Sequence, residues 1–459
     1  MSTENRPFNT GRAIVPTTTT EEPKFRLGSV TDKISSIIFS GAPLWWWLGF
    51  LVSLLLLFVF IFTLASVAIR GTGLWGINVP VVWGMAIVNL IFWIGIGHAG
   101  TFISAFLLLM RQQWRGTFSR FAEAMTLFAL ATAALFPLFH LGRVELFYFI
   151  IPHPNNLQLH PQWRSPLVWD FFAIATYGIV SLLFWYIDML PDLAALRDKA
   201  ERRSTKRIYG LLSMGWRGDA SHWSALHKTA YILAALATPL VISVHSIVGL
   251  DFAIANLPGW HHTIFPPFFV AGAIFSGLAM VLIFSVGLRS GFGLHKLISI
   301  NHLENAAKLM LITGLIVVYG YAIETFGAWY KGDIHEVLLV RERALGPYAP
   351  LYWGMLIFNG LVIQLLWFKR VRRNPTMLVL ISVSVILGMW LERFVIVPAS
   401  LSYTFTEGSW ALFNWNIWDI LTMISPFGLF LTLMFLFIRV LPMLPISEVQ
   451  QAAVEESAE

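Results

Sequence analysis

Long apolar stretches, separated by short polar loops, make up most of the chain. A helix needs roughly 20 apolar residues to cross the roughly 30 Å of hydrocarbon in a bilayer. Stretches of this length or more cover residues 44–69, 79–110, 119–150, 167–190, 226–256, 264–288, 303–330, 348–370, 376–398 and 416–440. The pattern therefore predicts an all-α integral membrane protein with about ten transmembrane helices.

The composition excludes other classes of protein. The 459 residues are 57% hydrophobic and 12% charged, whereas a soluble domain carries about 25% charged residues. No cysteine is present, which excludes cysteine-ligated iron–sulfur clusters, haem attached through C-x-x-C-H, and disulfides within this chain. The net charge of +6 does not indicate nucleic-acid binding, because the basic residues are spread over loops between the apolar stretches.

The distribution of basic residues predicts the orientation. Loops on the side that holds both termini contain about 24 of the 31 lysine and arginine residues, which places both termini in the cytoplasm. Residues 1–43 are polar, with no apolar signal-peptide core, and are expected to form a disordered cytoplasmic tail. Residues 441–459 are expected to form a short acidic cytoplasmic tail.

A faint internal repeat suggests how the helices are grouped. Ala99-Gly100 and Ser104 recur as Ala271-Gly272 and Ser276, and the motif Pro-Leu-x-Trp at 166–169 recurs at 350–353. Repeats of this kind predict two related structural units. We expect a first four-helix bundle over 79–256, a second over 264–398, and flanking helices at 44–70 and 416–440. Asp170 follows the first Pro-Leu-x-Trp motif, whereas Gly354 follows the second.

Ionisable residues inside a bilayer are candidates for function, because a charge there costs several kcal/mol. Several fall in the outer half of the predicted spans. They are His140, Arg143, Asp170, His245, Asp251, Tyr321, Glu324 and Arg393. We expect His140 roughly 15 Å below the outer end of its helix, with Arg143 one turn nearer the outside. His140 with Asp170, and His245 with Asp251, would suit the acceptance of two protons.

Structural interpretations compete with each of these functional ones. His98 could be a hydrogen-bond partner between helices, and Arg393 could form a neutralising ion pair with Glu392 or Asp251. Arg143 and Glu324 could lie at the membrane interface, where charge costs little, and Tyr321 could belong to the aromatic belt.

A second set of ionisable residues points towards the cytoplasm. These residues could extend a proton path inwards, although most fall at predicted helix ends near water; His98 and Asp419 are the exceptions. The set comprises His98, Glu123, Asp188, Asp192, His302, Glu304 and Asp419. No metal site is predicted from either set.

Five segments together carry a resemblance. They are GIGHAGTFISAFLLLMRQQWR (95–115), ALFPLFHLGR (134–143), SPLVWDFF (165–172), VHSIVGLDFA (244–253) and LERFVIVP (391–398). The chain resembles the polysulfide-reductase (NrfD-like) membrane-anchor family, most closely the branch found in bacterial alternative complex III. The resemblance implies two four-helix bundles and a quinol pocket formed by His140, Asp170, Asp251 and Arg393, with His98 and His245 carried over less directly.

The resemblance also implies a function and its partners. Menaquinol or ubiquinol would be oxidised near the periplasmic face of the bacterial inner membrane, with proton release or translocation. Electrons would pass to an extrinsic iron–sulfur protein and to c-type cytochromes, beside a second related membrane subunit and lipid. This chain would hold no haem or iron–sulfur cluster of its own.

Two functions from other classes stay open. A b-type cytochrome would use two of His98, His140 and His245 as haem ligands. A secondary transporter would suit two bundles with buried charges, although the repeated motifs run in the same direction and indicate a parallel repeat.

Overall fold

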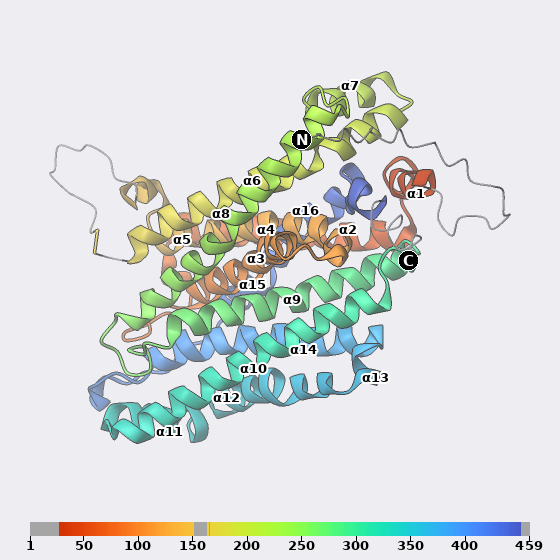
Figure 1. The fold of residues 1–459 in the computed structure, drawn as a ribbon. Helices are drawn as coiled ribbons and strands as arrows, with labels where there is room; N and C mark the ends of the chain where they lie inside the picture. Colours follow the sequence, from red (N-terminus) through yellow and green to blue (C-terminus); the bar gives the residue numbers. More distant parts are fainter. Residues whose placement is uncertain (1–26, 151–162, 165, 451–459) are drawn as a thin grey trace, which may run out of the picture.

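The computed structural model describes residues 27–150, 163–164 and 166–450 (Figure 1). This part of the chain is helical and contains no β-strand. Ten helical segments are long and apolar enough to cross a membrane, as predicted. They are Leu44–Arg70 (α2), Met85–Leu109 (α3), Ser119–His140 (α4 and α5), Pro166–Lys199 (α6), Ala220–Ala253 (α8), Phe265–Gly291 (α9), Ile300–Lys331 (α10), Ala349–Trp367 (α12, η4 and η5), Pro375–Ala399 (α14 and η6) and Ile417–Val440 (α15 and α16).

Helix α1 and the C-terminal segment 441–450 lie at the same end of the helical domain (Figure 1). Helix α1 (Leu27–Phe39) contacts the end of α16, where the Arg439 guanidinium donates to the carbonyls of Ile37 and Ser40. The Gln450 amide donates to the Thr31 hydroxyl at 2.9 Å. We call this side of the molecule the terminal side and the other the opposite side.

The expectation of a disordered tail over 1–43 is wrong for Leu27–Phe39, which is helical. Val30, Ile34 and Ile37 repeat at helical spacing and are buried against the bundle, so this segment has an apolar face to pack. Residues 441–450 also fold against the terminal side, where Leu444 and Ile446 are buried. The ends of the two predicted tails, 1–26 and 451–459, lie outside the described residues.

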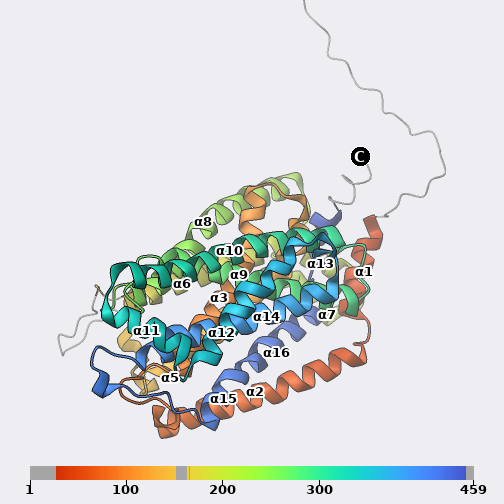
Figure 2. The same cartoon turned by 90° about the horizontal axis from the view of Figure 1, so that it is seen from below.

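Helices α3, α4, α6 and α8 correspond to the predicted first bundle, and α9, α10, α12 and α14 correspond to the predicted second. Helix α9 packs on α3 and α8 as well as on α10 and α14, so the division into two bundles stays a prediction. Helices α2 and α16 pack on each other at one edge of the molecule, with α16 also against α4 (Figure 2). The Pro-Leu-x-Trp motifs open the equivalent helices α6 and α12.

The two bundles meet where α3 packs against α9. The approach is close: a Cβ built on Gly277 would lie 1.9 Å from the Cβ of Ala99, and one on Gly100 would lie 1.9 Å from the carbonyl oxygen of Ala122 in α4. Small residues allow such contacts between membrane helices. Helix α3 is therefore the central helix of the fold, and 83% of an 18-residue apolar stretch within it is buried.

Three helix lengths differ from the prediction. The third span ends at His140 rather than at residue 150, because Gly142 adopts a positive φ of 77° and the short helix Val144–Ile150 (η3) follows. His140 is therefore at the end of its helix, and Arg143 is exposed beyond it instead of one turn along the same face. Helices α6 and α8 have 34 residues each, about 50 Å of helix, and lead to α7 (Arg203–Leu212) on the terminal side (Figure 1).

Candidate functional site

The first part of the site is a pair of carboxyl groups at the opposite side of the first bundle. Asp170 lies in the first turns of α6, and Asp251 lies near the end of α8, which packs on α6. Their side chains lie next to each other. Two adjacent carboxyl groups away from water favour a state in which one of them binds a proton. The Oδ1 atom of each residue is buried and makes no hydrogen bond within the described chain.

An aromatic residue that the sequence analysis did not single out joins His140 to this region. The Trp83 ring lies edge-on to the His140 ring at 6.3 Å between centroids and edge-on to Phe252 at 6.0 Å. Phe252 directly follows Asp251 in α8. The structure thus brings Asp170 beside Asp251 and places His140 and Phe252, the residue after Asp251, around Trp83. Asp251 lies beside Asp170, and a joint role of His245 and Asp251 in accepting protons stays a prediction.

His245 instead meets His98 in the middle of the fold. The two buried rings lie 4.6 Å apart between centroids at 62°, and the Nδ1 atom of His98 is hydrogen-bonded to the Ile94 carbonyl. The His98 ring stacks on Tyr177 at 4.7 Å. Because the two imidazoles touch each other, no haem fits between them, and the geometry disfavours the cytochrome alternative at this pair. The His98 Nε2 atom and both His245 nitrogens make no hydrogen bond within the described chain.

Arg393 approaches His245 from the second bundle. Its guanidinium lies over the Phe269 ring at 4.7 Å from the centroid, and the centroid of the His245 ring lies 6.2 Å from that of the same Phe269 ring. The Arg393 Nη1 atom pairs with the carboxylate of Glu392 at 2.5 Å. Of the two partners considered from the sequence, Glu392 rather than Asp251 is therefore the one that Arg393 contacts.

Glu392 continues a polar network through the second bundle. The buried Tyr321 hydroxyl donates to Glu392 and accepts from the Asn359 amide at 2.8 Å. This burial overturns the aromatic-belt interpretation of Tyr321. Asn359 lies in the π-helical turn Ile357–Leu361, and a second π-helical turn, Val395–Ala399, follows Arg393. Turns of this kind within α-helices are frequent at functional sites.

The network ends at the opposite side in an ion pair. Glu324 accepts from Arg343 at 2.6 Å, and Arg343 also donates to the Ser400 hydroxyl at 2.7 Å. Arg343 comes from helix α11 (Ile334–Leu345), which falls in a predicted loop. The signal in the sequence that could have identified Arg343 is its position near the end of an amphipathic stretch.

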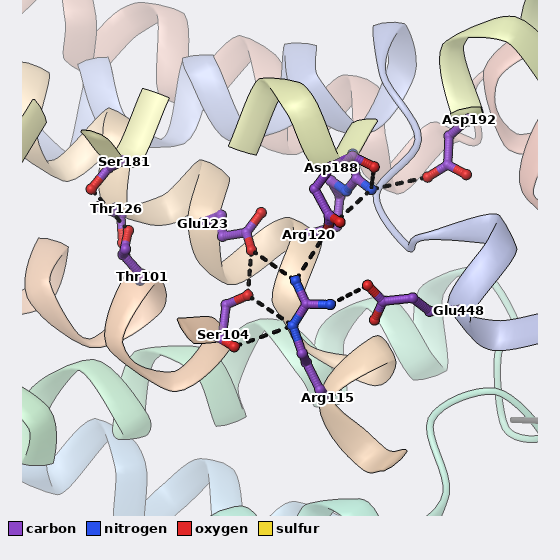
Figure 3. Close-up of polar contacts among 10 residues, drawn as sticks. All are labelled: Thr101, Ser104, Arg115, Arg120, Glu123, Thr126, Ser181, Asp188, Asp192 and Glu448. Carbon is purple, nitrogen blue, oxygen red and sulfur yellow. Dashed lines mark hydrogen bonds and ion pairs between the residues drawn. The ribbon is translucent and has the colours of Figure 1, made fainter. Parts of the chain in front are cut away.

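The terminal side of the first bundle holds a buried ionic cluster (Figure 3). Arg115 lies 3.2 Å from Asp188 and 3.7 Å from Glu123, and Arg120 lies 3.0 Å from Asp192 and 3.6 Å from Asp188. All five side chains are buried. The interpretation of these carboxylates as solvated helix ends is therefore wrong: two guanidinium groups from the 111–120 loop region neutralise them inside the protein.

The C-terminal segment closes this cluster. Glu448 forms an ion pair with Arg115, and the backbone amide of Ile446 donates to Asp192 at 3.2 Å. Burial raises the pKa of the Glu448 carboxyl, against the opposing effect of Arg115. Burial alone would lower the pKa of Arg115, but the charges of Glu448, Asp188 and Glu123 outweigh it and raise that pKa. A cavity of about 600 Å³ adjoins the cluster, with Asp188, Arg115 and Glu448 in its wall.

Hydroxyl groups lie between the cluster and the histidine pair. Ser104 donates to Glu123 and accepts from Arg115 at 3.3 Å, and Thr101, one turn along α3, donates to Ser181 at 3.1 Å (Figure 3). The Tyr177 hydroxyl donates to the Gly97 carbonyl at 3.0 Å. A discontinuous row of polar side chains, which we call the polar file, thus follows α3 from Arg115 towards His98.

Three further candidates lie apart from this file. Asp419 is in a capping box with Asn416 at the start of α15 and accepts from the Gly76 amide at 3.0 Å, which is a structural arrangement. Glu304 pairs with Arg373 at 2.8 Å, and His302 is hydrogen-bonded to Thr117 at 2.8 Å, both on the terminal side. Among the described residues, no group of histidine and carboxylate side chains could hold a metal ion.

Comparison with known proteins agrees with this architecture. The family model of the polysulphide reductase NrfD matches residues 74–404, which include both bundles. The chain belongs to the NrfD family. The resemblance noted from the five sequence segments is thereby confirmed at the level of the family, and the protein is an integral membrane member of it.

Three similar proteins are subunits of reductases or oxidoreductases. A putative dimethyl sulfoxide reductase membrane subunit of Halobacterium salinarum is 28% identical over 44% of this chain and 43% of its own length. A selenate reductase subunit of Mesobacillus selenatarsenatis is 24% identical over 62% of each chain. An Hdr-like menaquinol oxidoreductase integral membrane subunit of Archaeoglobus fulgidus is 21% identical over 64% of each chain. The aligned regions cover less than two thirds of the length of each relative.

Proposed function

We propose that this chain is the quinol-oxidising membrane subunit of an electron-transfer complex of the alternative complex III type. Quinol binds at the opposite side of the first bundle, near Asp170, Asp251 and His140. The observation that carries the proposal is the pair of adjacent carboxyl groups, each with a buried Oδ1 atom and with no ion pair among the described residues. The name of the menaquinol oxidoreductase relative supports menaquinol as the substrate, with ubiquinol as the alternative.

The chemistry needs acceptors for two protons. Oxidation of a quinol to a quinone releases two electrons and two protons, one from each hydroxyl. The Asp170–Asp251 pair already holds one proton and has one more carboxylate to protonate, and the neutral His140 imidazole can accept the second proton. Both groups then release protons at the opposite side. Trp83 and Phe252 supply an apolar wall beside them for the quinol ring.

The electrons must leave to other subunits. We assign to partners the extrinsic iron–sulfur protein, the c-type cytochromes and a second related membrane subunit, all in the bacterial inner membrane with the opposite side facing the periplasm. The excess of basic residues on the terminal side supports a cytoplasmic location for both termini. Asp170 and Asp251 lie at the side from which such an extrinsic partner would approach.

The polar file supports proton movement through the first bundle as a second part of the proposal. Protons would enter from the terminal side at Glu448 and Asp188, continue by Glu123 and Ser104, and reach His98 and His245. The unpartnered nitrogens of this pair and the nearby Arg393–Glu392–Tyr321 network provide the continuation towards the opposite side. Water would bridge the gap between Thr101 and Ser104.

The quinol site is tested first in the assembled complex. In the Asp170→Asn variant, which keeps the side-chain volume, we expect at least about tenfold weaker binding of a fluorescent quinol-analogue inhibitor, because a polar contact and the bound proton are lost. Glu407→Gln is the matched control, since Glu407 is an exposed carboxylate on the same side. Unchanged binding in Asp170→Asn, with the complex intact, would overturn the site.

The proton route has a separate readout. We expect His98→Ala and Glu123→Gln complexes in proteoliposomes to move fewer protons per electron while quinol oxidation continues. Glu304→Gln serves as the control, because Glu304 is paired with Arg372 and Arg373 outside the file. A normal proton-to-electron ratio in a His98→Ala complex that turns over would remove the route and leave the quinol site untouched.

A further inference from the structure

Helix α7 (Arg203–Leu212) connects α6 to α8 on the terminal side and does not cross the membrane (Figure 1). Two tyrosines attach it to the bundle. Tyr209 is buried, and its hydroxyl donates to the carbonyl of Val440, the last residue of α16, at 2.8 Å. The Tyr186 hydroxyl of α6 donates to the Leu212 carbonyl at 2.6 Å. Since Val440 ends a membrane-spanning helix, the bond from Tyr209 holds α7 at the level where that span leaves the bilayer.

The side of α7 next to Tyr209 is apolar and exposed. Ile208, Leu211 and Leu212 repeat at helical spacing, and Leu211 is 80% exposed. Met214 follows at 72% exposure, in a left-handed conformation with φ 47° that a glycine would adopt more easily. A stripe of large apolar side chains in water is unfavourable, so this face needs a cover.

The other side of α7 is basic. Arg203, Lys206 and Arg207 repeat at the same helical spacing and are exposed, with Arg202 just before them. None of these four residues forms an ion pair among the described residues. Of the nearby acids, Asp198 pairs with Arg197 at 2.8 Å, and Glu201 is exposed.

We propose that α7 lies in the plane of the membrane interface and binds anionic phospholipid headgroups of the leaflet on the terminal side. The Ile208–Leu211–Leu212 face enters the acyl-chain boundary, and the Arg203–Lys206–Arg207 face pairs with the headgroup phosphates. Apolar and basic faces on one short helix are the pattern of interfacial helices. Basic clusters next to membrane spans attract anionic lipids, by about 1 kcal/mol per charge. Because the basic side chains of α7 complement the negative charge of the headgroups, an anionic lipid surface fits this helix better than an apolar protein surface does.

The first test measures depth. Because the chain has no cysteine, Leu211→Cys provides a single attachment point for a nitroxide label, and Ser221→Cys, exposed near the start of α8, provides the control. In full-length protein in nanodiscs containing phosphatidylglycerol, we expect oxygen to relax the label at 211 several-fold more than a water-soluble nickel chelate does, and the reverse at 221. Equal accessibility to the chelate at both positions would overturn the proposal and favour a protein partner.

The second test measures lipid selection. An environment-sensitive fluorophore at Leu211→Cys should be quenched more by chain-brominated phosphatidylglycerol than by brominated phosphatidylcholine at the same mole fraction. Removing three charges in Arg203→Gln/Lys206→Gln/Arg207→Gln should reduce this ratio several-fold, to near one, without changing quinol oxidation. The control removes two exposed charges of α13 (Lys369–Arg372) in Lys369→Gln/Arg370→Gln and should leave the ratio unchanged. A ratio near one in the unaltered helix would overturn the proposed lipid specificity.

Discussion

The opposite and terminal sides of the first bundle use buried carboxylates in contrasting ways. On the opposite side, Asp170 and Asp251 contact each other and have no ion pair among the described residues. On the terminal side, Glu123, Asp188 and Asp192 lie between Arg115 and Arg120. Carboxyl groups of one bundle therefore have only each other as partners at one end and have guanidinium partners at the other.

This difference follows from how a low-dielectric interior treats charge. A buried carboxylate is stable only if a cation accompanies it or if it binds a proton. Two adjacent carboxyls without a cation cannot both ionise, and such pairs perform proton chemistry. Carboxylates between guanidinium groups are instead held in charge-assisted hydrogen bonds and ion pairs. The presence or absence of neighbouring cations, rather than the acidic residues themselves, distinguishes the two ends of the first bundle.

The strongest test of the comparison is a double substitution at the carboxyl pair. Asp170→Asn and Asp251→Asn should each lower quinol oxidation by about 100-fold or more, the range for losing a proton acceptor. Because the two carboxyls act as one unit, Asp170→Asn/Asp251→Asn should cost little more than either change alone. Steady-state kcat/KM of the assembled complex measures this. If the fold-reductions in kcat/KM of the two single variants multiply in the double variant, the two carboxyls act independently. The contrast between the two sides of the bundle would then fail.

The ionic cluster should respond in stability. Arg120→Leu leaves Asp192 buried without its cation, which should cost about 3–5 kcal/mol. Arg120→Leu/Asp192→Leu removes both charges and should recover most of that loss. The Tm in detergent, followed by intrinsic tryptophan fluorescence, measures both variants. An equally low Tm in the double variant would mean that packing, rather than charge balance, determines the cost.

The second bundle provides an intermediate case, in which Glu392 has both an arginine and a phenol as partners. Tyr321→Phe removes the bond to Glu392 and leaves the Asn359 amide without that acceptor, so we expect a loss of about 1–3 kcal/mol. Tyr319→Phe is the matched control, because Tyr319 is exposed two residues earlier on α10. Equal Tm values for the two variants would assign the Tyr321 hydroxyl no role in stability.

The smallest effect concerns Glu336, a carboxylate on the opposite side that does have partners. Burial would raise its pKa, but the ion-pair contact with His262 at 3.4 Å, the hydrogen bond from the Gly259 amide and the charge of Arg343 lower it. Its stabilisation is therefore present above the unfolded-state pKa and is lost as the pH falls through the lower folded-state pKa. We expect under about 1 kcal/mol, seen as weaker hydrogen-exchange protection of the Gly259 amide at acidic pH. Glu336→Gln should abolish this pH dependence.

The spans are predictable from the sequence because their signal is local: about 20 apolar residues in a row identify a membrane helix wherever it packs. The end of the third span is not, because it depends on the single positive φ of Gly142. The helix at 27–39 also escapes prediction, because its short apolar stripe is stabilised by α16 rather than by its own length.

The site is predictable only in part. Intramembrane position identifies His140, Asp170, His245 and Asp251 as candidates, but not their partners, which depend on how α3, α6 and α8 pack. Sequence reasoning places the terminal cluster in solvent because Arg115 falls in a predicted loop and its partner Glu448 is 333 positions away. No local pattern links two such residues, so their burial could not be predicted from the sequence.

The close packing of α3 between α4 and α9 also has a consequence for biogenesis. Ribosomes deliver α3 to the bilayer before α8 and α9, which supply His245 and the Gly277 surface. During insertion, α3 is therefore in the bilayer before these helices, and the His98 imidazole is exposed to hydrocarbon or to a chaperone. The central helix therefore gains its contacts with α9 only when the second bundle is inserted.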